Sequence, residues 1–256
     1  IPLLFPNSAG AKFASLVGGK GFLQKARAAA RLRPRDLIPT PALKLGLTDP
    51  VCELNMGQTA EILAREFEIE RSAQDFFALR SHMRASAAAE RLAEEIVPVY
   101  DTSRGTAVLH DNGVRPNQTL EALAKLRPIF EPVTGTVTAG NSSQITDGAV
   151  ALLVGTTSVA RELNLEPLGI IRDFAYAGCD PKRMGLGSVY AVDRLLKRLH
   201  LGLGDADLVE INEAFAAQVL ACAQAFASDS FAREHLGRAS RLGELDPELL
   251  NKNGGA

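Results

Sequence analysis

A short polar segment in the middle of the chain carries residue types that can bind a ligand. It reads Val137-Thr138-Ala139-Gly140-Asn141-Ser142-Ser143 and is followed by Asp147-Gly148. A glycine lets a ligand approach the backbone closely, and the hydroxyl and amide groups around it can donate hydrogen bonds. A plain turn beside an apolar run would have the same composition, so the residues alone leave both interpretations open.

A second segment, Glu210-Ile211-Asn212-Glu213-Ala214-Phe215-Ala216, places two polar side chains between an apolar strand and a long apolar helix. Ligands of α/β proteins gather at the carboxyl ends of strands. An amide at that position, such as that of Asn212, can hold a water molecule or donate to an oxyanion. Asn212 and Glu213 could equally cap the helix that follows.

Other familiar catalytic patterns are missing from the sequence. There is no P-loop lysine motif and no HExxH motif. Cys52, Cys179 and Cys222 are odd in number and form no CxxC pair, which suits a reducing compartment better than a disulfide scaffold. The histidines lack the spacing of metal ligands: they are His82, His110, His200 and His235. We therefore predict no metal site, and we expect Cys222 to be a packed core thiol.

Alternating strands and helices in the second half of the chain predict an α/β fold. Hydrophobic periodicity predicts helices over 55–67, 72–95, 119–126, 157–163, 188–199 and 214–227. Apolar runs predict strands over 136–138, 149–154, 168–174 and 207–212. Because strands that alternate with helices imply right-handed crossovers, we expect a parallel or mixed sheet covered by helices.

Composition indicates an ordinary globular chain with a basic opening. The 256 residues are 46% hydrophobic and 23% charged, with a net charge of −2, which argues against long disorder and against nucleic-acid binding. No apolar run reaches the roughly 18 residues that span a bilayer. Residues 1–50 hold eight basic and two acidic side chains. This opening could lie on an anionic membrane or bind a phosphorylated ligand, or simply be a solvated basic helix and loop.

Several segments together resemble the thiolase family. The two polar segments match two of its signature stretches, and further matches follow the same order along the chain: Met56–Glu61, Gln74-Asp75, Leu79–His82, Lys125–Pro128 with Phe130, and Asn253–Ala256. The stretch Ser230–Arg238 and the basic opening resemble fatty-acid-oxidation thiolases of the trifunctional-complex type. The resemblance implies a layered αβαβα thiolase fold, incomplete at both ends. It divides the chain into a loop domain covering CoA (1–134), the end of the N-terminal half (135–158) and the start of the C-terminal half (159–256).

The resemblance also implies a reaction and a set of site residues. Thiolases cleave 3-ketoacyl-CoA with free CoA, or run the reverse Claisen condensation, in fatty acid β-oxidation or acetoacetyl-CoA metabolism. CoA is then a co-substrate, and no covalently bound cofactor is implied. The family's asparagine that holds an oxyanion-hole water matches Asn212. The positions that match its CoA contacts are Met56, Arg115, Phe130, Ser143, Ala214 and Phe215.

The resemblance implies further that the family's nucleophilic cysteine, Gly-His-Pro histidine and second cysteine lie outside these 256 residues. We therefore expect this chain to be inactive on its own. Implied partners are acyl-CoA and CoA, a second copy in a homodimer or tetramer, a hydratase/dehydrogenase subunit and a peripheral membrane contact. The implied location is the bacterial cytoplasm or the mitochondrial matrix. The alternative is a non-catalytic CoA-binding or assembly fragment that docks on a membrane or a partner subunit through its basic opening.

Overall fold

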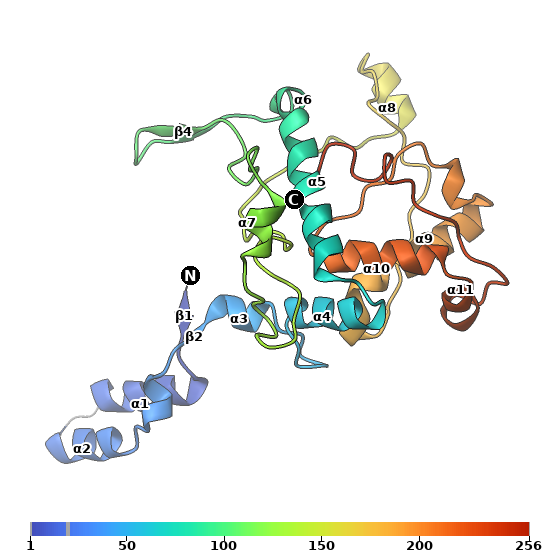
Figure 1. Cartoon of the computed structure of the whole chain (residues 1–256). Helices are drawn as coiled ribbons and strands as arrows, with labels where there is room; N and C mark the ends of the chain where they lie inside the picture. Colours follow the sequence, from blue (N-terminus) through green and yellow to red (C-terminus); the bar gives the residue numbers. More distant parts are fainter. Residues whose placement is uncertain (1, 19–20, 256) are drawn as a thin grey trace. The chain divides into compact units, whose positions relative to one another are not determined.

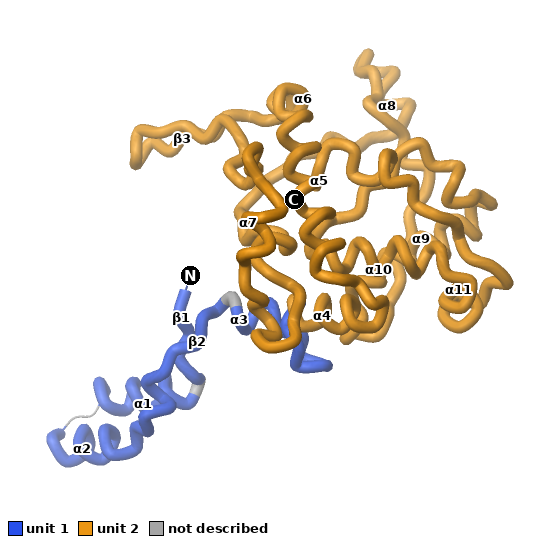
Figure 2. Tube along the Cα trace, viewed as in Figure 1, with its two compact units in different colours: residues 1–56 blue, residues 57–256 orange. Residues whose placement is uncertain are grey.

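The computed structural model describes residues 2–18 and 21–255, and it divides the chain into two compact units (Figure 2). Unit 1 covers residues 1–56 and unit 2 covers residues 57–256. Within the described residues, no helix is long and apolar enough to cross a membrane. Each unit is described below by itself.

Unit 1 is a pair of basic helices closed by a short antiparallel ladder. Its elements are β1 (Leu3–Leu4), α1 (Asn7–Gly18), α2 (Phe22–Ala30), a 3-10 turn (Pro34–Leu37), β2 (Thr40–Pro41) and α3 (Ala42–Gly46), with β1 paired to β2. The buried Asp36 carboxylate accepts hydrogen bonds from Ser8 Oγ (3.0 Å), Lys12 Nζ (2.6 Å) and the Arg33 N–H (2.8 Å). The Lys12 bond, followed by the Arg33 N–H, lowers the pKa of Asp36 to about 2. This carboxylate ties α1 to the turn after α2.

Unit 2 contains the helices predicted from periodicity. They are α4 (Met56–Glu66, which begins at the last residue of unit 1), α5 (Arg71–Ala87), α6 (Ala89–Ala93), α7 (Leu120–Ala124), α8 (Thr157–Glu162), α9 (Gly187–Leu199) and α10 (Ala216–Ala227) (Figure 1). A further short helix, α11 (Asp229–His235), was not predicted from the sequence. The predicted helix over 72–95 is divided between α5 and α6. Two short strands, β3 (Val99–Asp101) and β4 (Thr106–Val108), form an antiparallel hairpin. Thr119 caps α7 as a polar N-cap should, because its hydroxyl accepts the Ala122 N–H.

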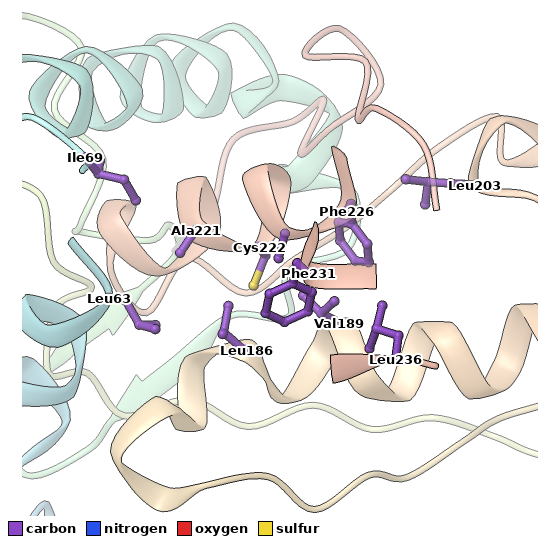
Figure 3. Close-up of a cluster of buried hydrophobic side chains, with 11 residues drawn as sticks. Leu63, Ile69, Leu186, Val189, Leu203, Ala221, Cys222, Phe226, Phe231 and Leu236 are labelled. Atoms are coloured by element: carbon purple, nitrogen blue, oxygen red, sulfur yellow. The ribbon is translucent and has the colours of Figure 1, made fainter. Parts of the chain in front are cut away.

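The core of unit 2 is built around α10. Eight of the 12 residues of α10 are buried, as expected for a helix that is apolar on every side. Leu63, Leu186, Val189 and Phe231 pack around it in the largest cluster, together with Phe226 of α10 itself (Figure 3). Cys222 lies inside this cluster, as predicted, and burial raises the pKa of its thiol. The helix therefore gives a rigid base to the residues that precede it.

The sheet predicted from the apolar runs is not found in the described residues. Residues 149–154 and 168–174 have no regular secondary structure there, and Val150, Leu153 and Ile171 are 86%, 90% and 73% exposed. Residues 136–138 are likewise irregular, and the 207–212 segment makes a single parallel bridge, Val209 to Leu250. The four strand predictions are therefore wrong for this structure. An apolar run becomes a strand only where neighbouring strands satisfy its N–H and C=O groups, and no other described segment pairs with the backbone of 149–154.

Candidate functional site

The two polar segments singled out in the sequence meet at the start of α10. The Ser143 N–H donates to the Ala214 carbonyl at 2.9 Å, and the Ala216 N–H donates to the Asn141 carbonyl at 2.9 Å. Ser142 and Phe215 form an antiparallel bridge between these two bonds. The turn over residues 138–143 therefore pairs with the backbone that leads into α10, across about 70 residues of sequence.

A buried carboxylate on α4 fixes the chain just before this turn. Glu61 is 3% exposed and accepts hydrogen bonds from the N–H groups of Thr136 (3.0 Å) and Val137 (2.9 Å) and from the Thr136 hydroxyl (3.2 Å). Only glycine fits at residue 135, because a Cβ there would lie 2.4 Å from Glu61 Oε1. Helix α4 thereby sets where the turn begins.

A second buried carboxylate, on α5, holds the turn itself. Asp75 accepts from Arg71 Nε at 2.8 Å and from Asn141 Nδ2 at 3.0 Å. Asn141 Oδ1 in turn accepts the Thr138 N–H at 2.8 Å, which closes the turn. Arg71 also donates to the Leu123 carbonyl at 2.7 Å, so the same network reaches the end of α7. These hydrogen bonds thus connect helices α4, α5 and α7 to the six-residue turn.

The turn forms one wall of a cavity of about 550 Å³, a size typical of small-molecule sites. We call it the main cavity. Its lining comes from α5 (Phe77, Ala78, Ser81, His82, Ala85), from residues in the range 108–126 that include Arg115, from Ala139–Gln144 and Thr146–Gly148, and from Glu213, Ala216 and Gly255. Segments far apart in sequence therefore enclose one space within unit 2.

His82, on α5, is one of two imidazoles that line the cavity, and it holds the segment that carries Arg115. The Arg115 N–H donates to His82 Nδ1 at 3.3 Å. Burial lowers the pKa of His82, and the charge of Arg115 lowers it further. A neutral imidazole that accepts at Nδ1 carries its proton on Nε2, which is a donor. His82 therefore has one nitrogen committed to the protein and one donor remaining.

Glu213 does not cap α10. The N-cap of α10 is Phe215, which makes no side-chain cap bond, whereas the 7%-exposed Glu213 carboxylate accepts from Asn251 Nδ2 at 2.6 Å. The Asn251 amide also exchanges two 2.8 Å hydrogen bonds with the backbone of Ile211. A Cβ on Gly255 would overlap the Glu213 carboxyl group, so Glu213 and Gly255 are in close contact at the cavity wall. The capping interpretation left open by the sequence is wrong for Glu213.

The structure brings together most of the residues expected at the site. Arg115 and Ser143 line the main cavity. Phe130, Ala214 and Phe215 do not line it. The rings of Phe130 and Phe215 pack edge to face with centroids 6.0 Å apart, and the Ala214 carbonyl accepts the Ser143 N–H. Asn212 is exposed and does not line the cavity, and Met56 lies at the end of unit 1. In the described part of the chain, no three His, Cys, Asp or Glu side chains are grouped to hold a metal ion.

Several residues that shape the cavity were not assigned a role from the sequence. They are Glu61, Asp75, Asn141, Asn251 and His82. A usable signal existed for Asp75 and His82, since seven residues separate them and a helix brings that spacing back to one face. Asn251 offered no such signal, because 38 residues separate it from Glu213.

Replacing Asp75 by Asn tests whether the hydrogen bonds of Asp75 to Arg71 and Asn141 hold the turn in place. We expect Asp75→Asn to lower the free energy of unfolding by about 3 kcal/mol, because it leaves the largely buried Arg71 without a countercharge. Urea unfolding measures the change. Asp207→Asn, at an exposed position, is the matched control and should change stability by less than about 0.5 kcal/mol. Equal stability of the two variants would show that the turn does not depend on Asp75.

His82 should make the stability of the chain sensitive to acid. Since its folded-state pKa lies below the unfolded value of 6.5, the unfolded chain takes up the proton first as the pH falls. The stability supplied by neutral His82 is therefore present above that value and is lost below it. His82→Asn keeps an acceptor for the Arg115 N–H and should reduce the loss of stability between about pH 7.5 and 5.5. The exposed His110→Asn should not reduce it, and identical pH profiles for all three proteins would contradict this role.

The sequence also matches two family models and many curated proteins. Residues 24–158 match the N-terminal domain of thiolase, and residues 165–256 match its C-terminal domain. Over 237 residues the chain is 43% identical to a 3-ketoacyl-CoA thiolase of Yersinia enterocolitica and 44% identical to one of Yersinia pestis. Each alignment covers 91% of this chain and 53% of the relative. The chain spans about half the length of these curated relatives.

Two solved structures share the fold. The acetyl-CoA acetyltransferase of Bacillus anthracis gives a TM-score of 0.76 at 38% identity, over 88% of this chain and 53% of that one. Human mitochondrial 3-ketoacyl-CoA thiolase gives 0.73 at 32% identity, over 97% of this chain and 64% of that one. The described elements, mostly helices with few strands, thus form part of a thiolase fold. Since the two family models together cover most of the sequence, the chain belongs to the thiolase family.

Proposed function

We propose that the main cavity binds the CoA portion of an acyl-CoA, as part of a thiolase-type acyltransferase. The observation that supports this most is the joining of Ser143, Ala214 and Phe215 beside the Phe130 ring, at the edge of a cavity that Arg115 also lines. These are five of the six positions that match the family's CoA contacts. The sixth, Met56, is proposed on the resemblance alone.

Each of these residues offers a group that suits one part of CoA. The Arg115 guanidinium can meet a phosphate or stack on the adenine face. The Ser143 hydroxyl is bonded only weakly within the described residues, to the Gln144 carbonyl at 3.4 Å, and can bond a pantetheine amide. The Phe130 and Phe215 rings supply an apolar edge. The exposed Asn212 amide is proposed to hold a water at an oxyanion site of the complete enzyme.

The reaction proposed for the whole protein is thiolytic cleavage of 3-ketoacyl-CoA by CoA, or the reverse Claisen condensation. The chain is similar both to a 3-ketoacyl-CoA thiolase, at 43% identity, and to an acetyl-CoA acetyltransferase, at 38% identity. We retain both fatty acid β-oxidation and acetoacetyl-CoA metabolism as settings, with a homodimer or tetramer as the assembly. We also retain the division into a loop domain (1–134), the end of the N-terminal half (135–158) and the start of the C-terminal half (159–256).

Calorimetric titration with CoA tests the proposal. We expect the chain to bind CoA, and Arg115→Gln to bind it roughly tenfold more weakly, because one charge-assisted contact is removed. Arg104→Gln is the matched control, since Arg104 is 82% exposed in the hairpin and lies outside the main cavity. Absence of CoA binding by the unmodified chain, with its fold verified by circular dichroism, would refute the proposal.

A specific observation in unit 1 favours the second candidate, docking on an anionic membrane. Phe22 and Leu23 of α2 are 86% and 74% exposed, beside the exposed cations Lys25 and Arg27. A basic helix with exposed apolar side chains suits a membrane interface. Lys20, part of the same basic opening, lies outside the described residues.

Cosedimentation with phosphatidylserine vesicles separates this candidate from CoA binding. Binding should weaken as salt is raised, and it should be lost when four exposed basic residues are changed to Gln: Lys25, Arg27, Arg31 and Arg33. The control changes four exposed arginines of unit 2 to Gln: Arg104, Arg127, Arg161 and Arg172. Equal loss in both variants, or no vesicle binding, would exclude a membrane-docking role for the opening.

A further inference from the structure

A second, smaller cavity lies on another side of α5, between α5, α10 and the segment 245–250. We call it the α5–α10 cavity. Its volume is about 210 Å³, and its walls are almost entirely apolar, with Phe76, Phe77, Val219, Leu220 and Leu245 among them. Phe76 is 59% exposed and stands at its edge. This volume is below that of a typical cofactor site, so it suits a short linear or small apolar group.

Two arginines, one helical turn apart on α5, behave differently at this cavity. Arg84 is fully engaged: Nη1 donates to the carbonyls of Pro247 (2.9 Å) and Leu250 (2.7 Å), and Nη2 pairs with Glu248 at 3.1 Å. It thereby holds the third wall in place. Arg80 lines the cavity, yet no oxygen of the described residues accepts a hydrogen bond from it. Its only direct partner there is the Phe77 ring, whose centroid lies 5.0 Å from Cζ.

The charges around Arg80 leave its guanidinium without a bonded carboxylate. The two acidic groups that act on it, Glu213 and Glu248, are bonded to Asn251 and Arg84. Burial and the positive charge of Arg84 lower the pKa of Arg80, with burial the larger cause. A half-buried guanidinium is usually hydrogen-bonded to a carboxylate or a carbonyl oxygen. Because Arg80 has no such bond and lies beside an apolar cavity, an anionic ligand is the partner that its charge would bind.

We propose that the α5–α10 cavity binds a small carboxylate with an aliphatic tail, its head on Arg80 and its tail between α5 and α10. The charge of Arg80 selects the anion, and the apolar walls select the tail. The site lies apart from the candidate CoA contacts and does not rest on the proposed function, because none of those residues lines it.

Calorimetric titration with three probes tests both halves of the site. Hexanoate has head and tail, 1-hexanol has a tail of the same length without charge, and acetate has the head alone. We expect hexanoate to bind roughly tenfold more tightly than either of the others. Arg80→Gln should abolish this advantage while leaving 1-hexanol unaffected. Ala223→Leu, which fills the cavity from α10, should weaken both ligands that have a tail.

A control variant and an NMR measurement of where hexanoate binds complete the test. Arg161→Gln, at an exposed position of α8, should bind all three probes as the unmodified chain does. In a methyl NMR spectrum, hexanoate should shift the signals of Val219, Leu220 and Leu245. The proposal is overturned if hexanoate and 1-hexanol bind alike, if no probe binds, if Arg80→Gln leaves hexanoate binding unchanged, or if the shifted methyls lie outside this cavity.

Discussion

The site depends on one buried amide, that of Asn141. Its side chain donates to Asp75 and to the Thr136 carbonyl and accepts the Thr138 N–H, while its backbone carbonyl accepts the Ala216 N–H. One residue thus joins α5, the polar turn and the start of α10. A buried amide costs free energy unless every group is satisfied, and at Asn141 nearly all are. The position of the turn is therefore set by hydrogen bonds rather than by apolar packing.

Three buried carboxylates, Glu61, Asp75 and Glu213, hold the segments of the site, and each is compensated differently. Glu61 accepts backbone N–H groups and a hydroxyl, Asp75 pairs with Arg71, and Glu213 accepts a neutral amide from Asn251. Backbone donors fix a segment of chain, whereas a guanidinium links separate helices. The three arrangements consequently perform different tasks: the first starts the turn, the second anchors it, and the third brings residues 251–255 to the cavity wall.

The sequence allowed most of the helices and both site segments to be predicted. It also predicted a sheet that the described residues do not form, and it did not reveal the full cavity. Helices α4, α5 and α10 follow from local periodicity, because their hydrogen bonds lie within the segment. Residues 149–154 have the composition of a buried strand, yet a strand needs partners that local sequence cannot supply. The same reasoning explains Glu213, whose role depends on Asn251 in a distant loop. Asp75 and His82 lie on one face of α5 because they are seven positions apart. That spacing could have added both residues to the predicted site.

The spacing of residues along α5 keeps two chemically different cavities apart. Ala78, His82 and Ala85 face the main cavity, whereas Ala73, Phe76 and Arg80 face the α5–α10 cavity. Phe77 lines both, and it is 4% exposed. A ring of that size separates the polar lining of one cavity from the apolar walls of the other. A small residue at position 77 would remove this partition and join the two cavities.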